Sequence, residues 1–260
     1  MLNKFFGLSG LPFGSNIRSY FETDGFMANK ASLETLLFGP QIALVSGQVG
    51  SGKSSLVKAF VNGLDPADYR VVYTSSSNPA TRALYRSIAE AFGIKAQWYG
   101  GDVKLQLLGH FDELISQGRY PIVILDECHT YSLAILDELK TFFDSKNNFS
   151  MILIGQPSIH KNLDSSYALP LKQRISVFIE TGGLSLEETK GYVEHHVAST
   201  GGKQPIFDDK CYPVLYQLTG GIPRIINQVC YQVMVRAYGA KSNIITDNMI
   251  TSAFESLRYH

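Results

Sequence analysis

Short apolar runs and helical patterns alternate along the first two thirds of the chain. The helical patterns fall at about residues 54–62, 81–92, 103–117 and 133–143. The apolar runs predict strands at about residues 41–47, 69–73, 120–127, 151–157 and 174–179. Residues 122–125 are continuously apolar, which is typical of a parallel strand covered on both faces. Because strands that alternate with helices join through right-handed crossovers, we predict an α/β fold with a five-stranded parallel sheet flanked by helices.

The pattern changes after residue 183, where the strand-like runs cease. Ser185 and Glu188 have the spacing of a capping box, which opens a predicted helix that runs to about residue 199. Pro223 suits the first position of a helix, and Gly220-Gly221 permits the tight turn before it. Further helices are predicted near residues 208–218, 223–238 and 246–258. We therefore divide this part of the chain into a core at 41–183 and an all-helical lid at 184–260.

Residues 1–40 form an extension with two small aromatic clusters, at 5–8 and 11–13, separated by turn residues. These clusters are too small to form a core alone, so we expect the extension to pack on the main domain. A helix predicted at about residues 31–38 leads into the first strand.

Composition and charge give no sign of a global attraction to a polyanion. Hydrophobic residues make up 45% of the chain, and 23 Lys and Arg balance 23 Asp and Glu. Any contact with nucleic acid must therefore come from a local patch or from an assembly. Cys128, Cys211 and Cys230 are widely spaced and are expected to be reduced core thiols of a cytoplasmic protein. The sequence has no signal-peptide pattern and no apolar run of about 18 residues, so we expect a soluble chain.

The first predicted strand ends in the spacing Gly-x-x-x-x-Gly-Lys-Ser, and a helix follows it. This order is the signature of a phosphate-binding loop, or P-loop, in which glycines let backbone N–H groups surround phosphate oxygens. We expect Lys53 to bind the β- and γ-phosphates of ATP and to assist catalysis, and Ser54 to coordinate Mg²⁺. The alternative is a chance glycine-rich turn before a helix. The predicted nucleotide contacts are Gly47, Gln48, Val49, Gly50, Ser51, Gly52, Lys53, Ser54 and Ser55.

Polar residues also lie at the carboxyl ends of the third and fourth predicted strands. Asp126 is placed to hold the hydration shell of Mg²⁺, and Glu127 to orient and deprotonate an attacking water. Gln156 either reads the γ-phosphate or the water, or only caps the following turn. Since ligands of open α/β sheets bind at the carboxyl ends of the strands, these residues and Gly47 are expected at one edge of the sheet.

These motifs, taken together, resemble an AAA+ ATPase, and more narrowly the ExeA/GspA-like ATPases, which are similar to the MuB and TnsC transposition ATPases. The resemblance runs through nearly the whole chain. It is carried by Phe6-Gly7-Leu8 with Pro12-Phe13, Gly47–Ser54, Leu125-Asp126-Glu127, Ile154-Gly155-Gln156-Pro157, Leu171-Lys172-Gln173-Arg174-Ile175 and Gly220-Gly221-Ile222-Pro223-Arg224-Ile225-Ile226-Asn227.

The resemblance implies roles for two arginines. Arg224 looks like the lid arginine that contacts the γ-phosphate within the same subunit. Arg174 matches an arginine finger inserted into a neighbouring subunit's site, and Lys172 competes for that role. The alternatives are an arginine salt-bridged at the lid hinge and one that caps the fifth strand.

The chain departs from the family where Asp-Glu-Ala-Gln or Asp-Glu-Ala-His usually follows the third strand, because here the sequence is Asp-Glu-Cys-His. Cys128 is interpreted as a packing residue. His129 either couples the water site to a partner or is structural.

Two function hypotheses follow from the resemblance. The first is an ATP-hydrolysing regulator of transposition that oligomerises with ATP on duplex DNA, without strong sequence specificity, and recruits or activates a transposase. The alternative is a secretion or signalling ATPase that acts on a protein partner without DNA. Glu127 argues against a third hypothesis, a nucleotide-gated binding module with negligible turnover. A chain that stops after the lid is similar to the soluble ATPases encoded with transposases, whereas the related secretion proteins are longer.

The DNA hypothesis needs basic or polar residues that repeat along an assembly, so that a weak patch sums to a phosphate-tracking surface. The stretch from residue 70 to 104 has a modest excess of basic residues. The alternative is that these are ordinary solvated helix charges. The candidate DNA contacts are Ser76, Asn78, Thr81, Arg82, Arg86 and Lys104.

Overall fold

The computed structural model describes residues 1–14, 20–95, 103–202 and 204–258. Over this part of the chain the elements fall into two compact units. One consists of residues 24–48 and 53–181, here called the core unit. The other consists of residues 1–23, 49–52 and 182–260, here called the lid unit. Each is described by itself.

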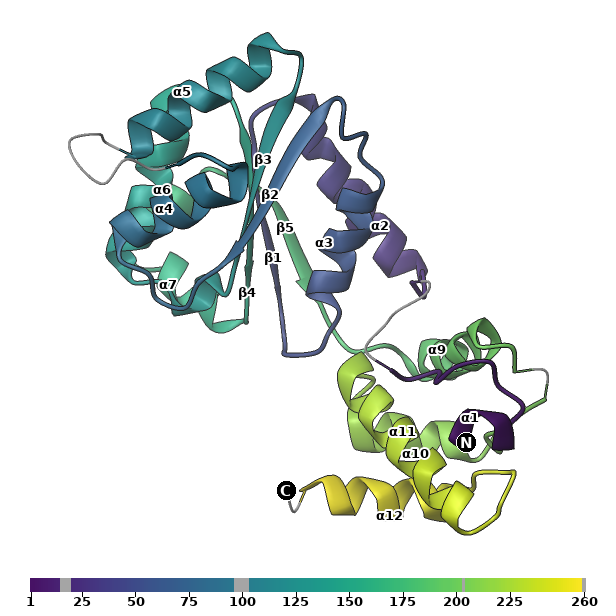
Figure 1. Ribbon diagram of the computed structural model, residues 1–260. Coiled ribbons are helices and arrows are strands. Elements are labelled where there is room, and N and C mark those ends of the chain that lie inside the picture. The colour runs from purple at the N-terminus through teal and green to yellow at the C-terminus, as the bar shows by residue number, and fades with distance from the viewer. Residues whose placement is uncertain (15–19, 96–102, 203, 259–260) are drawn as a thin grey trace. The chain divides into compact units, whose positions relative to one another are not determined.

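The core unit contains a five-stranded parallel sheet of order β2-β3-β4-β1-β5 (Figure 1). The strands are β1 (Ile42–Gly47), β2 (Tyr69–Ser75), β3 (Tyr120–Asp126), β4 (Ser150–Gly155) and β5 (Ile175–Thr181). The helices are α2 (Asp24–Glu34), α3 (Lys53–Asn62), α4 (Thr81–Phe92), α5 (Val103–Ser116), α6 (Leu133–Lys146), α7 (Ser158–Leu163) and α8 (Leu169–Lys172), with 3-10 turns η1 (Thr35–Phe38) and η2 (Cys128–Thr130). The predicted α/β class with a five-stranded parallel sheet is confirmed.

Two hydrophobic clusters cover the two faces of this sheet. In β1, Ile42 and Leu44 belong to a cluster shared with α4, α5 and α6, whereas Ala43 and Val45 belong to one shared with α2 and α3. Figure 1 shows the same division, with α2 and α3 on one side of the sheet and α4, α5 and α6 on the other. All six residues of β1 are buried, as are all six of β4, because both are central strands.

Some predicted bounds differ from the observed ones. Residues 31–38 are not one helix, because α2 ends at Glu34 and a 3-10 turn continues to Phe38. β5 begins at Ile175, so Arg174 precedes the strand. The short helices α7 and α8 were not predicted, since four to six residues are too few to show a helical period.

The lid unit is built from helices α9 (Leu186–Ser199), α10 (Cys211–Thr219), α11 (Pro223–Gly239) and α12 (Asp247–Arg258), with a short α1 (Leu2–Phe5). The Ser185 side chain accepts a hydrogen bond from the Glu188 N–H, and the Glu188 side chain accepts one from the Ser185 N–H, so the predicted capping box is present. Gly221 has φ +71°, and a Cβ there would lie 2.0 Å from the Leu184 carbonyl oxygen. Only glycine fits this close approach of two backbone segments.

The N-terminal extension requires a correction, because its first part packs on the lid helices and not on the core. Leu8 and Phe13 are buried in the hydrophobic cluster of the lid unit. Ser9 donates a hydrogen bond from its hydroxyl to the Thr200 carbonyl at 2.8 Å. From Asp24 onward the extension belongs to the core unit, where Leu33 is fully buried. The aromatic clusters of the extension thus complete the core of the lid.

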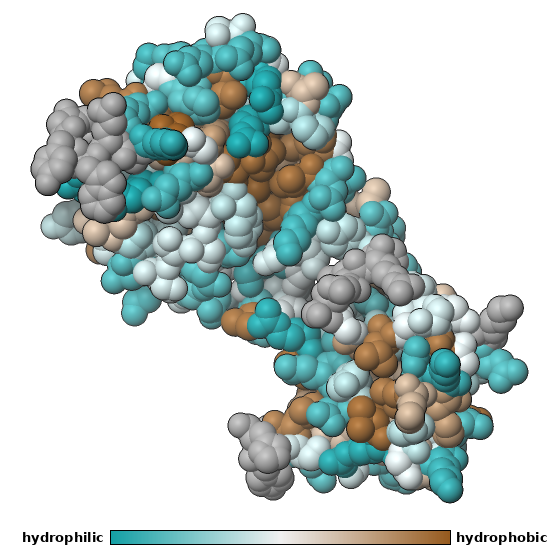
Figure 2. All heavy atoms as spheres, viewed as in Figure 1, coloured by the Kyte–Doolittle hydropathy of each residue, from teal (hydrophilic) through white to brown (hydrophobic). Residues whose placement is uncertain are grey.

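The surface seen in Figure 2 is largely hydrophilic, with hydrophobic residues in several separate areas. Cys128, Cys211 and Cys230 are all buried and free, in agreement with the prediction that they lie in the core. None of the described helices has both the length and the apolar composition needed to cross a membrane.

Candidate active site

The P-loop begins where β1 ends at Gly47 and finishes where α3 begins at Lys53. The backbone turns through left-handed conformations at Gly50 and Gly52, with φ of 86° and 99°. A Cβ placed on Gly52 would meet nothing within 4 Å, so the space beside it is open. No acidic residue lies in the first turn of α3 to repel an anion at its N-terminus. The loop therefore fits a bound phosphate group.

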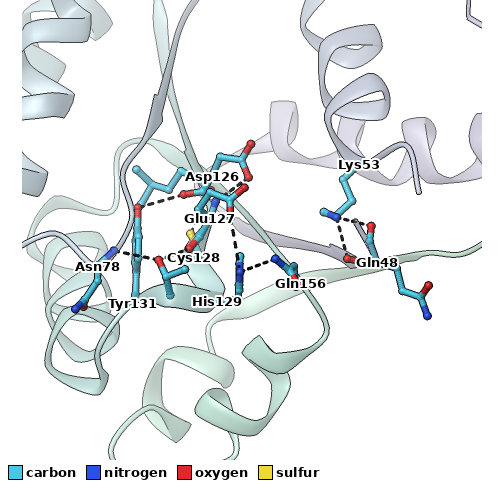
Figure 3. A network of polar contacts seen from close by, with 12 residues as sticks. Gln48, Lys53, Asn78, Asp126, Glu127, Cys128, His129, Tyr131 and Gln156 are labelled. Carbon is cyan, nitrogen blue, oxygen red and sulfur yellow. Dashed lines mark hydrogen bonds and ion pairs between the residues drawn. The ribbon is translucent and has the colours of Figure 1, made fainter. Parts of the chain in front are cut away.

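Lys53 points back to the strand end from which the loop departs. Its Nζ donates hydrogen bonds to the carbonyl oxygens of Gly47 and Gln48, each at 2.8 Å (Figure 3). Carbonyl oxygens are weaker partners for an ammonium group than phosphate oxygens, which carry formal charge. The Lys53 ammonium group is thus held at the loop, and it can exchange the two carbonyl oxygens for phosphate oxygens.

Asp126 is the last residue of β3, and the neighbouring strand brings Tyr73 to it. The Asp126 carboxylate accepts a hydrogen bond from the Glu127 N–H at 2.7 Å and another from the Tyr73 hydroxyl. Burial, followed by this hydrogen bond, raises the pKa of Tyr73 well above its ordinary value, while a contact with the Ser54 hydroxyl acts in the opposite direction. Tyr73 therefore stays a neutral donor that contacts both predicted Mg²⁺ residues. Both of these residues offer oxygen atoms, the donors that Mg²⁺ prefers.

Glu127 occupies a strained backbone conformation. Its φ is 60°, in the left-handed region that residues with a side chain rarely adopt. Its carbonyl accepts hydrogen bonds from the Thr130 N–H at 2.9 Å and from the Thr130 hydroxyl at 2.8 Å. Asn78, with φ of 44°, donates from its N–H to the same hydroxyl at 3.0 Å. These contacts fix the backbone at the end of β3 and turn the Glu127 side chain out of the sheet.

His129 lies between Glu127 and Gln156 (Figure 3). The His129 Nε2 atom is 2.8 Å from Gln156 Nε2 and 3.6 Å from Glu127 Oε2. Gly155 allows this approach, since a Cβ there would lie 3.2 Å from the His129 backbone nitrogen. The Gln156 side chain is thus directed to His129, which follows the end of β3, while the Gln156 backbone carbonyl accepts a hydrogen bond from the Ile159 N–H at 3.0 Å.

Cys128 faces the interior and takes no part in this polar group. It is fully buried, and its Sγ donates to the Leu125 carbonyl at 3.2 Å. Burial raises the pKa of the Cys128 thiol well above its ordinary value. This placement agrees with a packing residue.

Both predicted finger residues form ion pairs within the chain. Arg174 donates from Nε to the Asp144 Oδ1 atom at 2.6 Å and from Nη1 to the Pro170 carbonyl at 3.1 Å. Lys172 contacts Asp164 Oδ1 at 2.5 Å. The Arg174 guanidinium holds the pKa of the Asp144 carboxyl below its usual range.

Arg224 lies in the first turn of α11, in the lid unit, and is exposed. Its backbone N–H donates to the Gly50 carbonyl at 3.3 Å. A Cβ on Gly50 would lie 2.4 Å from the Arg224 Cβ, so this position of the loop requires glycine. Residues 49–52, the tip of the P-loop, are thus grouped with Arg224 in the same unit.

The candidate DNA contacts separate into two groups. Ser76, Asn78, Thr81, Arg82 and Arg86 lie in the loop after β2 and in the first turns of α4. Lys104 lies on α5 and pairs with Glu138 at 2.8 Å. Glu138 also accepts a hydrogen bond from the Tyr85 hydroxyl at 2.5 Å, and Lys104 lies over the Tyr85 ring. This internal network argues against Lys104 as a DNA contact.

Tyr73 is a site residue that sequence reasoning did not identify. It lies in the middle of a strand and pairs with Ile124, two residues before the level of Asp126. No sequence pattern specifies that β2 lies beside β3, so the contact of its hydroxyl with Asp126 has no signal in the sequence.

The chain is similar to known proteins in sequence and in fold. Residues 35–163 match a family model described as "AAA domain". The chain is similar to General secretion pathway protein A of Aeromonas hydrophila, with 28% identity over 268 aligned residues. That alignment covers 97% of this chain and 48% of the relative, so the chain spans about half the length of the curated relative it matches.

Solved structures share the fold at low sequence identity. The ORC2 protein of Aeropyrum pernix is similar with a TM-score of 0.72 and 15% identity, covering 96% of this chain and 72% of that chain. Cdc6p from Pyrobaculum aerophilum gives a TM-score of 0.70 and 16% identity, covering 90% of this chain and 67% of that chain. The Aeropyrum pernix ORC1 protein, solved in complex with DNA, gives a TM-score of 0.68 and 15% identity, covering 95% of this chain and 68% of that chain. With its P-loop, its Asp-Glu strand end and its helical C-terminal region, this chain has the P-loop AAA+ fold, and the family match and the secretion-pathway relative support an AAA+ ATPase.

Proposed function

We propose that this protein binds ATP with Mg²⁺ and hydrolyses the γ-phosphate bond. The observation that carries the proposal is that Glu127, partly exposed after the end of β3, lies in the same unit as Lys53, the residue that follows the P-loop. A carboxylate in this position suits a general base, and a lysine at a P-loop suits a phosphate ligand.

Each residue has a defined task in this mechanism. Lys53 exchanges the Gly47 and Gln48 carbonyls for the β- and γ-phosphate oxygens, and the P-loop N–H groups bind the same phosphates. Ser54 and Asp126 would hold Mg²⁺, which when bound neutralises charge that develops on the phosphates. Glu127 orients a water molecule and accepts its proton at a carboxylate oxygen. Gln156 donates from its amide to the γ-phosphate or to that water.

Two arginines complete the proposed site. Arg224 senses the γ-phosphate from the lid of the same subunit. Arg174 enters the site of a neighbouring subunit in a homo-oligomer, for which its guanidinium must exchange the Asp144 carboxylate for a phosphate oxygen. Such a finger contributes about 10³–10⁵ in rate where it has been measured, so hydrolysis is expected to depend on assembly.

The direct test is phosphate release at several concentrations of the purified protein with ATP and Mg²⁺. We expect turnover per subunit to rise with concentration, and Glu127→Gln to lose at least about a hundredfold in rate while it still binds ATP. Glu90→Gln on the exposed face of α4 is the matched control. Turnover in Glu127→Gln equal to that of the control would remove Glu127 from the role of base.

The similarity to General secretion pathway protein A favours a protein partner for this ATPase. In this version of the function, ATP binding assembles subunits that act on another protein, and hydrolysis releases it. Co-purification of a partner with Glu127→Gln and ATP, and its absence with ADP, is the result expected.

A second candidate function is ATP-dependent binding of duplex DNA, with recruitment of a transposase. The observation that favours it is the exposure of Asn78, Thr81 and Arg82, which lie together at the loop after β2 and the start of α4. Because an oligomer repeats this surface, individually weak phosphate contacts add along a duplex. Fluorescence anisotropy of a labelled random-sequence duplex, with an ATP analogue, with ADP and across a salt series, tests it. Binding that requires the ATP analogue and weakens with salt supports the DNA-binding function. If the duplex is not bound in any nucleotide state, action on a protein partner is the function that stays.

A further inference from the structure

His129 is linked to both residues that face the attacking water in the proposed mechanism. Its Nε2 atom is 2.8 Å from the end of the Gln156 side chain and 3.6 Å from Glu127 Oε2. The His129 side chain is only 13% exposed, whereas that of Glu127 is 45% exposed. Figure 3 shows the imidazole between these two side chains, joined to each by a dashed line.

The other ring nitrogen decides which tautomer the site favours. His129 Nδ1 is buried and has no hydrogen-bond partner among the described residues. A buried N–H without an acceptor is costlier and rarer than a buried lone pair without a donor, so the proton belongs on Nε2. A half turn of the Gln156 amide places its oxygen at the position 2.8 Å away. The Nε2–H group then has two acceptors within reach, the Gln156 oxygen and the Glu127 carboxylate.

Glu127 needs such a donor because its backbone is fixed but its carboxylate is not. The left-handed φ and the two hydrogen bonds from Thr130 to its carbonyl determine where the side chain begins. The side-chain torsions beyond Cβ are still free to rotate at an exposed site. The His129 Nε2–H group, whose nitrogen is 3.6 Å from Glu127 Oε2, is placed to select one orientation of the carboxylate.

We propose that His129 is a positioning residue that couples Gln156 to Glu127. Without a γ-phosphate, the His129 N–H is bonded to Gln156. When Gln156 turns to the γ-phosphate, the N–H passes to Glu127 and holds the carboxylate toward the attacking water. This inference rests on the proposed ATP hydrolysis, and it gives that site a means of fixing the base only when a triphosphate is present.

The first experiment compares His129→Phe, which keeps the ring and removes the donor, with His129→Gln, whose amide nitrogen reaches a similar position. We expect His129→Phe to lower the single-turnover hydrolysis rate about tenfold, the value of one hydrogen bond to a charged group. The affinity for an ATP analogue should stay within about twofold, and His129→Gln should recover most of the rate. His110→Phe on α5, where the histidine contacts Glu113 and Phe92, is the control for the same substitution elsewhere in the core unit. A His129→Phe rate equal to that of the control would overturn the proposal.

A double-mutant cycle separates coupling from a structural role. If His129 acts through Gln156, the loss caused by His129→Phe should shrink to less than about threefold in a Gln156→Ala background. Independent losses that multiply in the double variant would overturn the link between the two residues.

Nitrogen NMR of the imidazole gives a readout that does not depend on turnover. We expect the His129 signals, identified by their loss in His129→Phe, to report the Nε2–H tautomer, and the N–H signal to shift when an ATP analogue is added. A proton on Nδ1, or a signal unchanged by the analogue, would overturn the proposal. A wild-type protein that does not hydrolyse ATP would instead contradict the proposed function, and the NMR result would still decide how His129 is bonded.

Discussion

Arg174 and Asp144, 30 residues apart in the sequence, form a hydrogen-bonded ion pair with 2.6 Å between Arg174 Nε and Asp144 Oδ1. Lys140 contacts the other oxygen of the same carboxylate at 3.2 Å. The residue proposed to act in a neighbouring subunit's site is therefore bound to an anion of its own chain. A phosphate must displace this carboxylate before Arg174 serves as a finger.

Asp144→Asn should cost less than about 1 kcal/mol of unfolding free energy, because both side chains are about one third exposed and solvent screens the pair. The pKa of Asp144 is lower in the folded than in the unfolded protein. The ion pair therefore contributes fully to the free energy of unfolding above the pKa that Asp144 has in the unfolded chain. This contribution is lost only as the pH falls through the pKa that Asp144 has in the folded protein. Denaturation of the wild type and Asp144→Asn should thus give a constant difference from pH 7 to pH 5 that shrinks in 1 M salt. A difference that grows with salt would contradict an ion pair.

Mixing two inactive variants tests whether Arg174 acts between subunits. Arg174→Ala and Glu127→Gln should each be inactive alone. A mixture of the two should regain part of the wild-type rate, because some sites then combine an intact Glu127 with an intact Arg174 from the neighbour. Phosphate release from the mixture is the measurement. If this mixture stays inactive, while a mixture of Lys172→Ala and Glu127→Gln regains activity, Lys172 is the finger.

Lys53→Ala should abolish tight ATP binding, since it removes the only lysine that hydrogen-bonds the loop carbonyls among the described contacts. Titration with a fluorescent ATP analogue should show a loss of at least about a hundredfold in affinity. Lys58→Ala, an exposed position on the same helix, should bind like the wild type. Equal affinities of the two variants would exclude Lys53 as a phosphate ligand.

His196 should make the lid unit sensitive to acid. His196 is 7% exposed, and its imidazole lies beside Phe13 and Tyr192 and hydrogen-bonds the backbone of Pro12. Burial, and secondly His195, lowers the pKa of His196 to about 4. Because the folded pKa lies below the unfolded value near 6.5, stability is complete above pH 6.5 and falls by about 3 kcal/mol as pH drops to about 4.

The measurement for this prediction is the free energy of unfolding across that pH range. His196→Phe should remove most of the slope between pH 6.5 and pH 4. His110→Phe in the core unit should leave this pH dependence of the free energy of unfolding unchanged. Identical slopes in the wild type and His196→Phe would show that His196 titrates normally in the folded protein.

Much of the fold was predictable because local sequence patterns specify its elements. The apolar runs specify strands, the Gly-Lys-Ser spacing specifies the P-loop, and the capping box at Ser185 starts α9 where predicted. Helix α4 has the predicted bounds of Thr81 and Phe92. Short helices such as α8 gave no signal, since four residues cannot show a period of 3.6.

By itself, the sequence determined the α/β class, the P-loop, and the placement of Asp126 and Gln156 at strand ends, because these depend on residues near one another in the chain. Only the tertiary structure decided the strand order, and with it the contact of Tyr73 with Asp126. It likewise decided that Phe13 packs in the lid and that His129 lies between Glu127 and Gln156. These contacts join segments that are separated in the sequence, and their formation depends on how whole elements bury apolar surface against one another.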